Sequence, residues 1–233
     1  MFQAIQMKIG AIVQARMSSK RFPHKVLNEV EGEPLLQYLI ERIKLCSKLD
    51  HIVVATSTDK LDQEIYNFCK KNGHACYRGS LNNVASRFYE LAIEYSLDAI
   101  VRLNADSPLL DHMLIELAIQ HFLRENCDLV TNTFPRSFPK GQSVEVIKVK
   151  KFLNAYLSYN NEDEYEHVTP HFYNHPNQYK IYNFSSEKDL RTIQLSVDTP
   201  EDLEVFKQII SKMNRPHWEY NLEEILSIYS FIQ

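Results

Sequence analysis

The sequence of 233 residues lacks the two glycine-rich signatures that mark the commonest phosphate-binding loops. It contains no G-x-x-x-x-G-K-[ST] loop, which excludes a P-loop enzyme, and no G-x-G-x-x-G fingerprint of a dinucleotide-binding fold. The four cysteines show no C-x-x-C spacing and fall in patterned, apolar segments. We therefore expect small buried thiols, against the alternative of a zinc site or a disulfide framework.

Long apolar runs and a basic surplus are also missing. No stretch approaches the roughly 20 apolar residues that span a bilayer. The apolar N-terminus, MFQAIQMKIGAIV, has neither a basic leader nor a small-residue cleavage site. The formal net charge of -4 argues against general nucleic-acid binding, because such proteins usually carry extra cations for the phosphates. We expect a cytoplasmic protein with no membrane or nucleic-acid partner.

What the sequence does contain is an alternation of short β-branched runs and longer helical patterns. This alternation is typical of βαβ units on a parallel sheet, so the predicted fold class is α/β with a mostly parallel sheet. The predicted strands are Ile9–Ala15, His51–Thr56, Ala75–Tyr77, Ala99–Leu103 and Asp128–Asn132. The predicted helices between them are Pro34–Cys46, Lys60–Asn72, Asn82–Tyr95 and His112–Glu125, with Gly73 closing the second and Ser80 capping the third.

The rhythm changes after Thr133, where a proline-punctuated loop begins. The predicted elements there are a strand, a helix and a pair of strands, at Val144–Val149, Lys151–Tyr159, Tyr179–Phe184 and Arg191–Ser196. Helices near Pro200–Met213 and Leu222–Tyr229 finish the chain. We interpret residues 1–233 as a single domain with a small inserted lobe at about 134–190.

A cationic loop, QARMSSKRFPHKVL, follows the first predicted strand and carries Arg16, Lys20, Arg21 and Lys25. In an open α/β sheet, ligands bind beyond the carboxyl ends of the strands. Arginine makes forked contacts to phosphate oxygens and lysine acts as a point charge, so the two together suit a polyphosphate. The loop contains no glycine to expose backbone amides, which implies a grip by side chains. The alternative is a basic surface loop.

Two aspartates end predicted strands, Asp106 in RLNADSPLLD and Asp198 in LSVDTPEDLE. Such a carboxylate can hold Mg²⁺ while substrate phosphates supply further ligands, although a turn or a helix entry also favours aspartate. A capping box accounts for Thr199, Pro200 and Asp202 and leaves Asp198 without a structural task. Together with the cationic loop, the two aspartates indicate magnesium-dependent transfer of a nucleotidyl or phosphoryl group.

Three histidines, His167, His171 and His175, lie four residues apart. This spacing can place metal ligands on one helical face. Pro170 argues against one helix through all three, because it more naturally opens a new helix capped by Thr169. We expect a helix entry with packing roles, and His167 reaching a substrate, while a structural metal site stays the alternative.

The order of these motifs resembles that of the cytidylyltransferases related to spore coat polysaccharide biosynthesis protein F. They belong to the superfamily of CMP-sugar synthetases acting on 3-deoxy-manno-octulosonate and acylneuraminate. The resemblance runs from about Ile9 to Met213. The family's opening pattern, close to Q-A-R-x-x-S-x-R-x-P-x-K-x-L, is met by Gln14, Ala15, Arg16, Ser19, Arg21, Pro23, Lys25 and Leu27. The later segments ATST, RGSLNNVASRFYE, RLNADSPLLD, FPKGQSVEV, EHVTP and VDTPEDLE are similar to family segments in the same order.

The resemblance implies a Rossmann-like three-layer nucleotide-diphospho-sugar transferase fold and a CTP-dependent activity. The enzyme would transfer CMP from CTP to a small anionic acceptor, such as a sugar acid, and release pyrophosphate, in surface polysaccharide or glycoconjugate biosynthesis. Asp106 and Asp198 would hold Mg²⁺. The resemblance also implies a homodimer built through the middle lobe.

The resemblance assigns roles to further residues. Arg16, Arg21 and Lys25 would grip the triphosphate. The other predicted nucleotide-binding residues are Ala15, Ser19, Ala55, Thr56, Ser80, Arg87 and Asn104. Glu145 and His167 are predicted on the acceptor side.

The sequence departs from the family pattern at several positions. His24 stands where glycine is usual, Ala105 replaces the glycine before the metal aspartate, Asn83 stands where aspartate is common, and Gln142–Ser143 replaces Leu-Asp. The changes at Asn83 and Ser143 remove acidic contacts to the substrate, so they bear on the acceptor more than on the chemistry. Two alternatives remain. One is a glycosyltransferase, although the D-x-D signature is absent. The other is a catalytically silent nucleotide-binding subunit.

Overall fold

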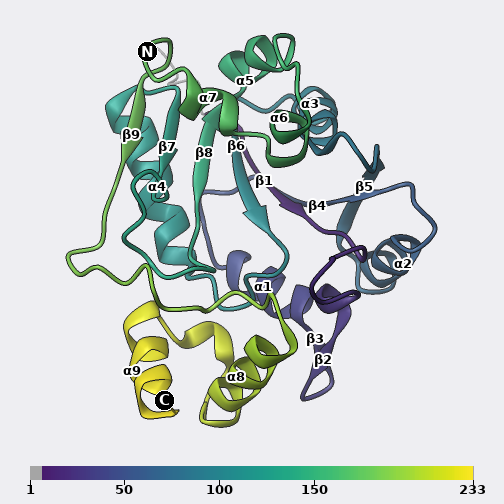
Figure 1. The fold of residues 1–233 in the computed structure, drawn as a ribbon, viewed down its shortest axis with the longest axis vertical. Helices are drawn as coiled ribbons and strands as arrows, with labels where there is room; N and C mark the ends of the chain where they lie inside the picture. Colours follow the sequence, from purple (N-terminus) through teal and green to yellow (C-terminus); the bar gives the residue numbers. More distant parts are fainter. Residues whose placement is uncertain (1–6, 233) are drawn as a thin grey trace, which may run out of the picture.

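A seven-stranded sheet organises residues 7–232, which the computed structural model describes. Its strand order is β5-β4-β1-β6-β8-β7-β9 (Figure 1). The strands are β1 (Ile9–Gln14), β4 (His51–Ser57), β5 (Ala75–Gly79), β6 (Ala99–Asn104), β7 (Leu129–Thr131), β8 (Glu145–Lys148) and β9 (Ile181–Asn183). A separate two-stranded sheet joins β2 (Glu29–Val30) to β3 (Glu33–Pro34).

The first four strands of the sheet run parallel, and β1 lies between β4 and β6. In this register Gln14, the last residue of β1, is level with Ala55 of β4 and Asn104 of β6. The strand β8 runs antiparallel to β6 and to β7, and β9 pairs with β7 in parallel. The predicted α/β class with a mostly parallel sheet is therefore confirmed, and the loops after β1 and β6 open at one edge.

Helices cover both faces of the sheet and complete three layers (Figure 1). The helices are α1 (Leu35–Ile43), α2 (Gln63–Lys71), α3 (Val84–Glu94), α4 (His112–Glu125), α5 (Val149–Tyr156), α6 (Glu162–His167), α7 (Pro170–Asn174), α8 (Pro200–Ser211) and α9 (Leu222–Ile232), with short 3-10 turns at Lys25–Leu27 and His217–Glu219. Along β1, Ala11 and Val13 pack in one apolar core and Ile12 in the other, as the alternation of a buried strand requires. The first core includes residues of α1, α4 and α8, and the second includes residues of α3, α5 and α7.

Residues 134–190 contribute two strands, β8 and β9, to the same sheet, and they supply helices α5 to α7.

The predicted pairing of the strands Tyr179–Phe184 and Arg191–Ser196 is wrong. Tyr179–Phe184 contains β9, but β9 pairs with β7. Residues Arg191–Ser196 form a loop with an isolated bridge between Gln194 and Lys140. The apolar Ile193 and Leu195 alternate with polar residues in the sequence, as in a strand, but within the described residues no strand pairs with this loop along its length.

Local signals placed most helix ends correctly. Gly73 follows α2 in a left-handed conformation, and Thr199 and Asp202 form the predicted capping box of α8. The predicted cap of α3 is wrong, because Asn83 accepts the hydrogen bond from the amide of Ser86. Ser80 lies one turn earlier, where its hydroxyl accepts a hydrogen bond from the amide of Asn83.

The predicted helix break between the histidines is confirmed, since α6 ends at His167 and α7 begins at Pro170. His171 pairs with Glu164, with 2.7 Å between Nδ1 and Oε1, and His175 contacts the carbonyl of His171. Within residues 7–232, no group of three or more His, Cys, Asp or Glu side chains is arranged to hold a metal ion alone.

All four cysteines are free thiols, and three of them are buried. No helix in the described part of the chain is long and apolar enough to cross a membrane.

Candidate active site

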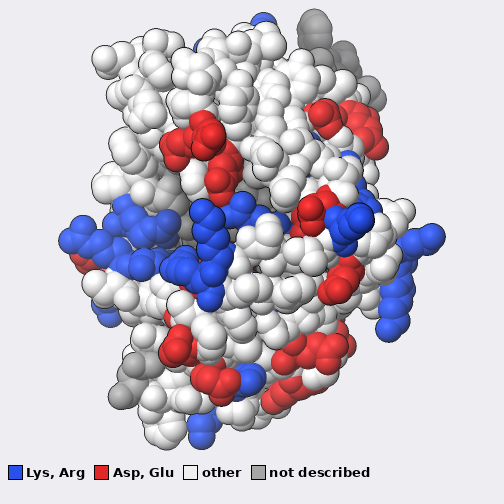
Figure 2. All heavy atoms as spheres, turned by 45° about the vertical axis from the view of Figure 1, so that its right-hand side comes forward, with Lys and Arg blue, Asp and Glu red and all other residues white. Residues whose placement is uncertain are grey.

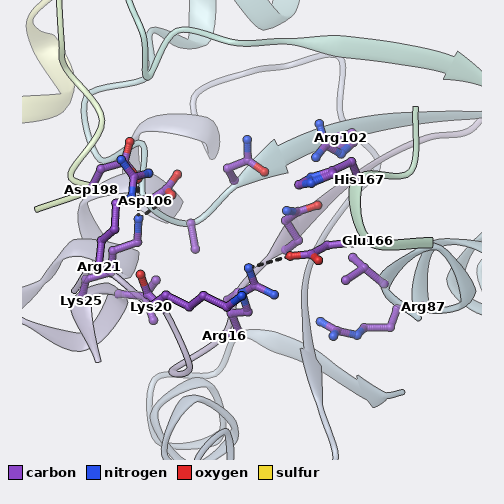
Figure 3. Close-up of a pocket in the computed structure, with 17 residues that line it drawn as sticks. Arg16, Lys20, Arg21, Lys25, Arg87, Arg102, Asp106, Glu166, His167 and Asp198 are labelled. Carbon is purple, nitrogen blue, oxygen red and sulfur yellow. Dashed lines mark hydrogen bonds and ion pairs between the residues drawn. The ribbon is translucent and has the colours of Figure 1, made fainter. Parts of the chain in front are cut away.

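A cleft of about 400 Å³ opens at the carboxyl ends of β1 and β6 (Figure 3). Its walls come from the loop after β1, the loop after β6, helix α6 and the segment before α8. On the face shown in Figure 2, Lys and Arg side chains gather around a hollow. The predicted site residues that line the cleft are Ala15, Arg16, Ser19, Arg21, Lys25, Arg87, Asn104, Asp106, His167 and Asp198. Most of the residues predicted from distant segments are therefore brought together.

The two strand-end aspartates meet around the ammonium group of Lys25. Its Nζ lies 2.8 Å from Oδ2 of Asp106 and 2.9 Å from Oδ1 of Asp198. The Lys25 side chain is only 8% exposed, so these contacts are shielded from water. Arg21 adds a contact of 3.0 Å between NH2 and Oδ1 of Asp198. One end of the cleft thus holds two carboxylates around a single cation, with a second cation beside them.

Asp198 keeps its negative charge in this setting. Burial alone would raise its pKa, but the hydrogen bond and charge of Lys25 and the charge of Arg21 outweigh burial, and the pKa lies below its usual value. Its second oxygen, Oδ2, accepts hydrogen bonds from Gln194 Nε2 at 3.2 Å and Ser196 Oγ at 3.4 Å. The carboxylate is therefore ionised and held in one orientation.

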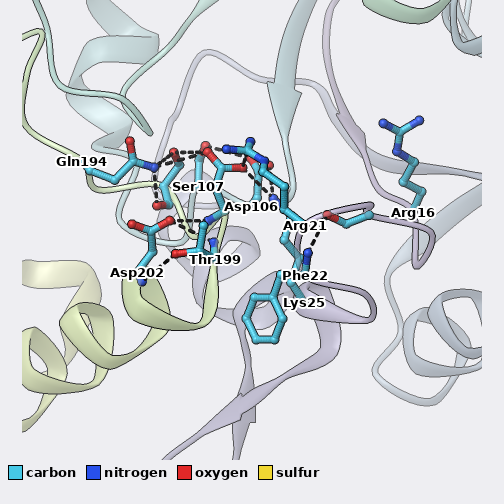
Figure 4. A network of polar contacts seen from close by, with 12 residues as sticks. Arg16, Arg21, Phe22, Lys25, Asp106, Ser107, Gln194, Thr199 and Asp202 are labelled. Carbon is cyan, nitrogen blue, oxygen red and sulfur yellow. Dashed lines mark hydrogen bonds and ion pairs between the residues drawn. The ribbon is translucent and has the colours of Figure 1, made fainter.

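Backbone hydrogen bonds fix the two aspartates relative to each other. The carbonyl of Asp106 accepts a hydrogen bond of 2.8 Å from the amide of Val197, which joins the two segments directly. The carboxylate of Asp202 accepts the amides of Asp198 and Thr199, both at 2.9 Å (Figure 4). The capping box of α8 therefore does two things: it starts the helix and it holds the backbone of Asp198 at the cleft.

The cationic loop after β1 is anchored from inside the protein. Met17 is buried, and its amide donates a hydrogen bond of 2.7 Å to Oδ1 of Asp62. The Met17 carbonyl accepts the amides of Ser19 at 3.0 Å and of His24 at 2.9 Å, which folds the loop back on itself. His24 has φ 62°, a left-handed conformation. A left-handed backbone favours glycine, so the departure from the family pattern at His24 concerns the conformation of the local backbone.

The opposite wall of the cleft carries Glu166 and His167 from α6. Glu166 forms an ion pair with Arg16 of the cationic loop, with 2.8 Å between Oε1 and NH2 (Figure 3). The hydrogen bond from Arg16 lowers the pKa of Glu166 against the opposing effect of burial. The side chain of His167 is 55% exposed, so it is free to meet a ligand.

Arg87 lines the cleft but is almost completely buried. Its guanidinium donates to the carbonyls of Ser80 at 2.7 Å, Leu81 at 3.1 Å and Ala55 at 3.3 Å. Burial lowers its pKa to about 10, which leaves it charged at neutral pH. The arrangement ties the loop before α3 to the edge of β4, and it places one more positive charge at the cleft wall.

The floor of the cleft contains two amide side chains, Gln14 and Asn104, from paired positions of β1 and β6. The side-chain oxygens Oε1 of Gln14 and Oδ1 of Asn104 are buried and make no hydrogen bond with the part of the protein that the structure describes. Buried polar atoms of this kind call for an explanation, and a bound ligand that reorients the amides supplies one.

The structure does not place four predicted residues in the cleft lining: Ala55, Thr56, Ser80 and Glu145. Ala55 and Thr56 point their side chains into the protein and are fully buried. The hydroxyl of Ser80 serves the turn before α3. Glu145 is buried under Arg102, with 2.6 Å between Oε2 and NH1, and it also accepts a hydrogen bond of 2.5 Å from Tyr173.

Four polar residues of the cleft were not predicted as site residues: Gln14, Lys20, Arg102 and Glu166. Gln14 and Arg102 carried a signal, since one ends a strand and the other lies two residues before the end of a strand. Lys20 was one of the four loop cations. Glu166 lies beside His167 in the EHVTP segment, but nothing in the sequence indicates that α6 faces the loop after β1.

The cleft offers chemistry for a polyanion and a divalent cation. The two carboxylates that enclose the ammonium group of Lys25 are suitable ligands for Mg²⁺, and a pair of carboxylates leaves positions for phosphate oxygens. The remaining cations extend from this point along the cleft. A mostly parallel α/β sheet with such a site at its strand ends is the arrangement expected of a nucleotidyltransferase.

The chain belongs to the cytidylyltransferase family, whose family model matches residues 10–226. It is 32% identical over 208 residues to the spore coat polysaccharide biosynthesis protein SpsF of Bacillus subtilis, covering 86% of this chain and 85% of that protein. It is 30% identical over 186 residues to a 3-deoxy-manno-octulosonate cytidylyltransferase of Geotalea daltonii, covering 78% of this chain and 70% of that enzyme. A solved cytidylyltransferase structure from Leptospira borgpetersenii superposes with a TM-score of 0.92 at 29% identity, over 97% of this chain and 95% of that one.

Proposed function

We propose that this nucleotidyltransferase moves CMP from CTP to a sugar acid or a related anionic acceptor and releases pyrophosphate. The observation that carries the proposal is the meeting of Asp106 and Asp198 around Lys25 at the end of a cationic cleft. The similarity to a 3-deoxy-manno-octulosonate cytidylyltransferase supports a sugar acid as acceptor. The similarity to SpsF supports a place in surface polysaccharide or glycoconjugate biosynthesis.

In the proposed reaction the triphosphate lies along the cationic loop. Arg16, Arg21 and Lys25 bind its oxygens, and Lys25 then moves from the carboxylates to the phosphates. Asp106 and Asp198 would hold Mg²⁺, which when bound would neutralise charge on the phosphates. Gln14 and Asn104, whose buried oxygens have no partner in the described protein, contact the nucleoside.

The acceptor approaches from the wall formed by α6, near His167 and Arg102. Its hydroxyl oxygen attacks the α-phosphorus in line and gives up its proton to solvent. The bond from the α-phosphorus to the oxygen bridging it to the β-phosphate breaks, and pyrophosphate leaves. Arg102 is held by the buried Glu145, so its guanidinium has a fixed orientation toward an anionic acceptor. Catalysis is then mainly positioning and charge neutralisation, because phosphoryl and nucleotidyl transfers need little covalent help from the protein.

The test is pyrophosphate release with Mg²⁺, a single nucleotide and a panel of sugar acids that includes 3-deoxy-manno-octulosonate. We expect release with CTP and an acceptor, and little with ATP, GTP or UTP. A preference for another nucleotide would refute the cytidyl part. Binding of CTP without release for any acceptor would indicate a silent subunit, and transfer from a preformed nucleotide sugar would indicate a glycosyltransferase.

We also propose that the protein is a homodimer joined through residues 134–190. The exposed aromatic ring of Phe134, packed against Tyr173 with 4.7 Å between centroids, supports a contact on this section. Light scattering of the purified protein tests the proposal. A monomer mass at micromolar concentration would contradict it.

A further inference from the structure

One ion pair, Arg16–Glu166, joins the two walls of the cleft (Figure 3). Arg16 comes from the loop after β1, and Glu166 comes from α6 on the other side. The two side chains are far apart in the sequence, and the contact of 2.8 Å spans the space that a ligand would enter. A ligand that binds the Arg16 guanidinium must therefore displace the Glu166 carboxylate from it.

Breaking this ion pair costs little free energy. The side chains of Arg16 and Glu166 are 45% and 43% exposed, and ion pairs with such exposure are weak. The hydrogen bond from Arg16 and the nearby charges of Arg16, His167 and Lys20 hold the pKa of Glu166 below its usual value, against the effect of burial. Glu166 is thus charged at neutral pH and competes for the guanidinium as an anion.

Two other arginines of the site, Arg87 and Arg102, are held more firmly. Arg87 is buried, and its donors go to three backbone carbonyls. Arg102 is bound to the buried carboxylate of Glu145. Arg16 differs from both because its carboxylate partner is exposed to solvent and stands across the cleft. A triphosphate offers forked contacts to a guanidinium, so it can replace a single carboxylate.

We propose that Glu166 is a positioning residue that holds Arg16 across the nucleotide-free cleft and yields it to the triphosphate of the incoming nucleotide. The inference rests on the proposed function, because it takes a nucleoside triphosphate as the ligand. Glu166 keeps the Arg16 side chain extended over the cleft. It also lowers the affinity for the nucleotide, because the ion pair must break before Arg16 can bind phosphate. The released carboxylate then lies beside His167 on the acceptor wall.

The proposed role and a purely structural role of Glu166 predict opposite effects of its replacement on nucleotide affinity. Removing the charge of Glu166 frees Arg16 in advance, so it tightens nucleotide binding. Removing a brace between α6 and the loop would loosen the cleft and weaken nucleotide binding. Glu162 provides a matched control, because it is an exposed glutamate on the same helix and does not line the cleft. Its replacement removes the same charge without touching Arg16.

The experiment is isothermal titration of wild type, Glu166→Gln, Glu162→Gln, Arg16→Ala and the double variant Arg16→Ala with Glu166→Gln. The probes are CTP and inorganic tripolyphosphate. We expect Glu166→Gln to bind both probes about two- to fivefold more tightly than wild type, the range set by an exposed ion pair. Glu162→Gln should show only a small part of this change. In the Arg16→Ala background, Glu166→Gln should bring no tightening, because the two residues act through one contact.

Equal or weaker binding by Glu166→Gln would overturn the inference, as would an equal gain in Glu162→Gln or a gain that persists without Arg16. Failure of the proposed function would give a different titration result. Wild type that binds neither probe would refute the proposed function and the inference together. Wild type that binds CTP while Glu166→Gln shows no gain would refute the inference alone.

Discussion

At the scale of single residues, Lys25 is the residue that brings the two strand-end aspartates together. Its ammonium group lies between Asp106 and Asp198, where it balances two negative charges in the nucleotide-free cleft. The two carboxylates are partly buried and close together, so a cation between them is stabilising, because charges partly removed from water need partners. The ammonium group of Lys25 therefore occupies the position to which the two carboxylates would attract a metal ion.

Replacing Lys25 with Met should make the carboxylate pair bind a divalent cation without nucleotide. We expect the nucleotide-free variant to bind Mn²⁺ at least about tenfold more tightly than wild type, since a positive charge within 3 Å of both carboxylates is gone. Electron paramagnetic resonance of free Mn²⁺ measures this without turnover. Lys20→Met is the control, because Lys20 lines the same cleft but makes no ion pair with either aspartate. Equal Mn²⁺ affinity in wild type and Lys25→Met would contradict the assignment.

His24 allows a separate test of how the cationic loop is built. Its φ of 62° strains a residue with a β-carbon, so His24→Gly should raise the free energy of unfolding by about 0.5–1 kcal/mol. Urea denaturation at neutral pH measures the change. Lys20→Gly, in the same loop but without a left-handed backbone, should give no gain. A loss of stability in His24→Gly would show that the His24 side chain does more than occupy a turn.

At the scale of elements, the position of α6 decides the shape of the cleft. Glu164 fixes this helix to α7, since its carboxylate pairs with His171 at 2.7 Å and accepts the amide of Asn160 at 3.0 Å. Burial would raise the pKa of Glu164, but the amide of Asn160 and the hydrogen bond and charge of His171 lower it below its usual value. Glu166 and His167, which line the cleft, are on the same short helix.

We expect Glu164→Gln to lower the free energy of unfolding by about 1–3 kcal/mol at pH 7, the usual cost of weakening a buried hydrogen-bonded charge. Because the folded-state pKa is lower than that of the unfolded chain, the carboxylate stabilises the fold fully above the unfolded value, about 4.3. This stabilisation is lost as pH falls through the folded pKa. The difference between wild type and Glu164→Gln in urea denaturation should therefore shrink below about pH 4. A difference that stays constant to pH 3 would contradict this origin.

The elements also show what could be predicted from sequence. The strands β1, β4 and β6 were predictable because each is an apolar run followed by a polar strand end, and their parallel order places Gln14, Ala55 and Asn104 level with one another. The ends of α2 and α8 were predictable from Gly73 and the capping box. Residues 191–196 were misread as a strand because the apolar Ile193 and Leu195 alternate with polar residues, whereas tertiary packing buries residues 195–197 in succession.

At the scale of the whole molecule, the cleft forms where the first and last parts of the chain meet. Arg42 of α1 is fully buried and donates hydrogen bonds to the carbonyls of Leu110 at 2.9 Å and Tyr220 at 2.7 Å, and to the carbonyl of His217. Asp111 accepts the amide of Leu222 at 2.8 Å. These contacts bind the C-terminal segment to α1 and to the residues that precede α4.

The half of the cleft made by strand ends was predictable, because the topology of a parallel sheet brings Arg16, Lys25 and Asp106 to one edge. The half made by α6 was not. Its position depends on how residues 134–190 pack against the second apolar core, and no local pattern carries that information. Thr56 and Glu145 were assigned from the family resemblance, and no local pattern in the sequence indicates that both side chains are buried outside the cleft lining.

The central claim is that Asp106 and Asp198 act together on a nucleoside triphosphate. The most direct measurement is the rate of pyrophosphate release from CTP and Mg²⁺, with the best acceptor of the sugar-acid panel, for wild type, Asp106→Asn and Asp198→Asn. Asp189→Asn, at an exposed aspartate outside the cleft, is the control. We predict that each active-site variant loses about 10³-fold in rate while the control keeps the wild-type rate. A wild-type rate in Asp106→Asn or Asp198→Asn would contradict the account.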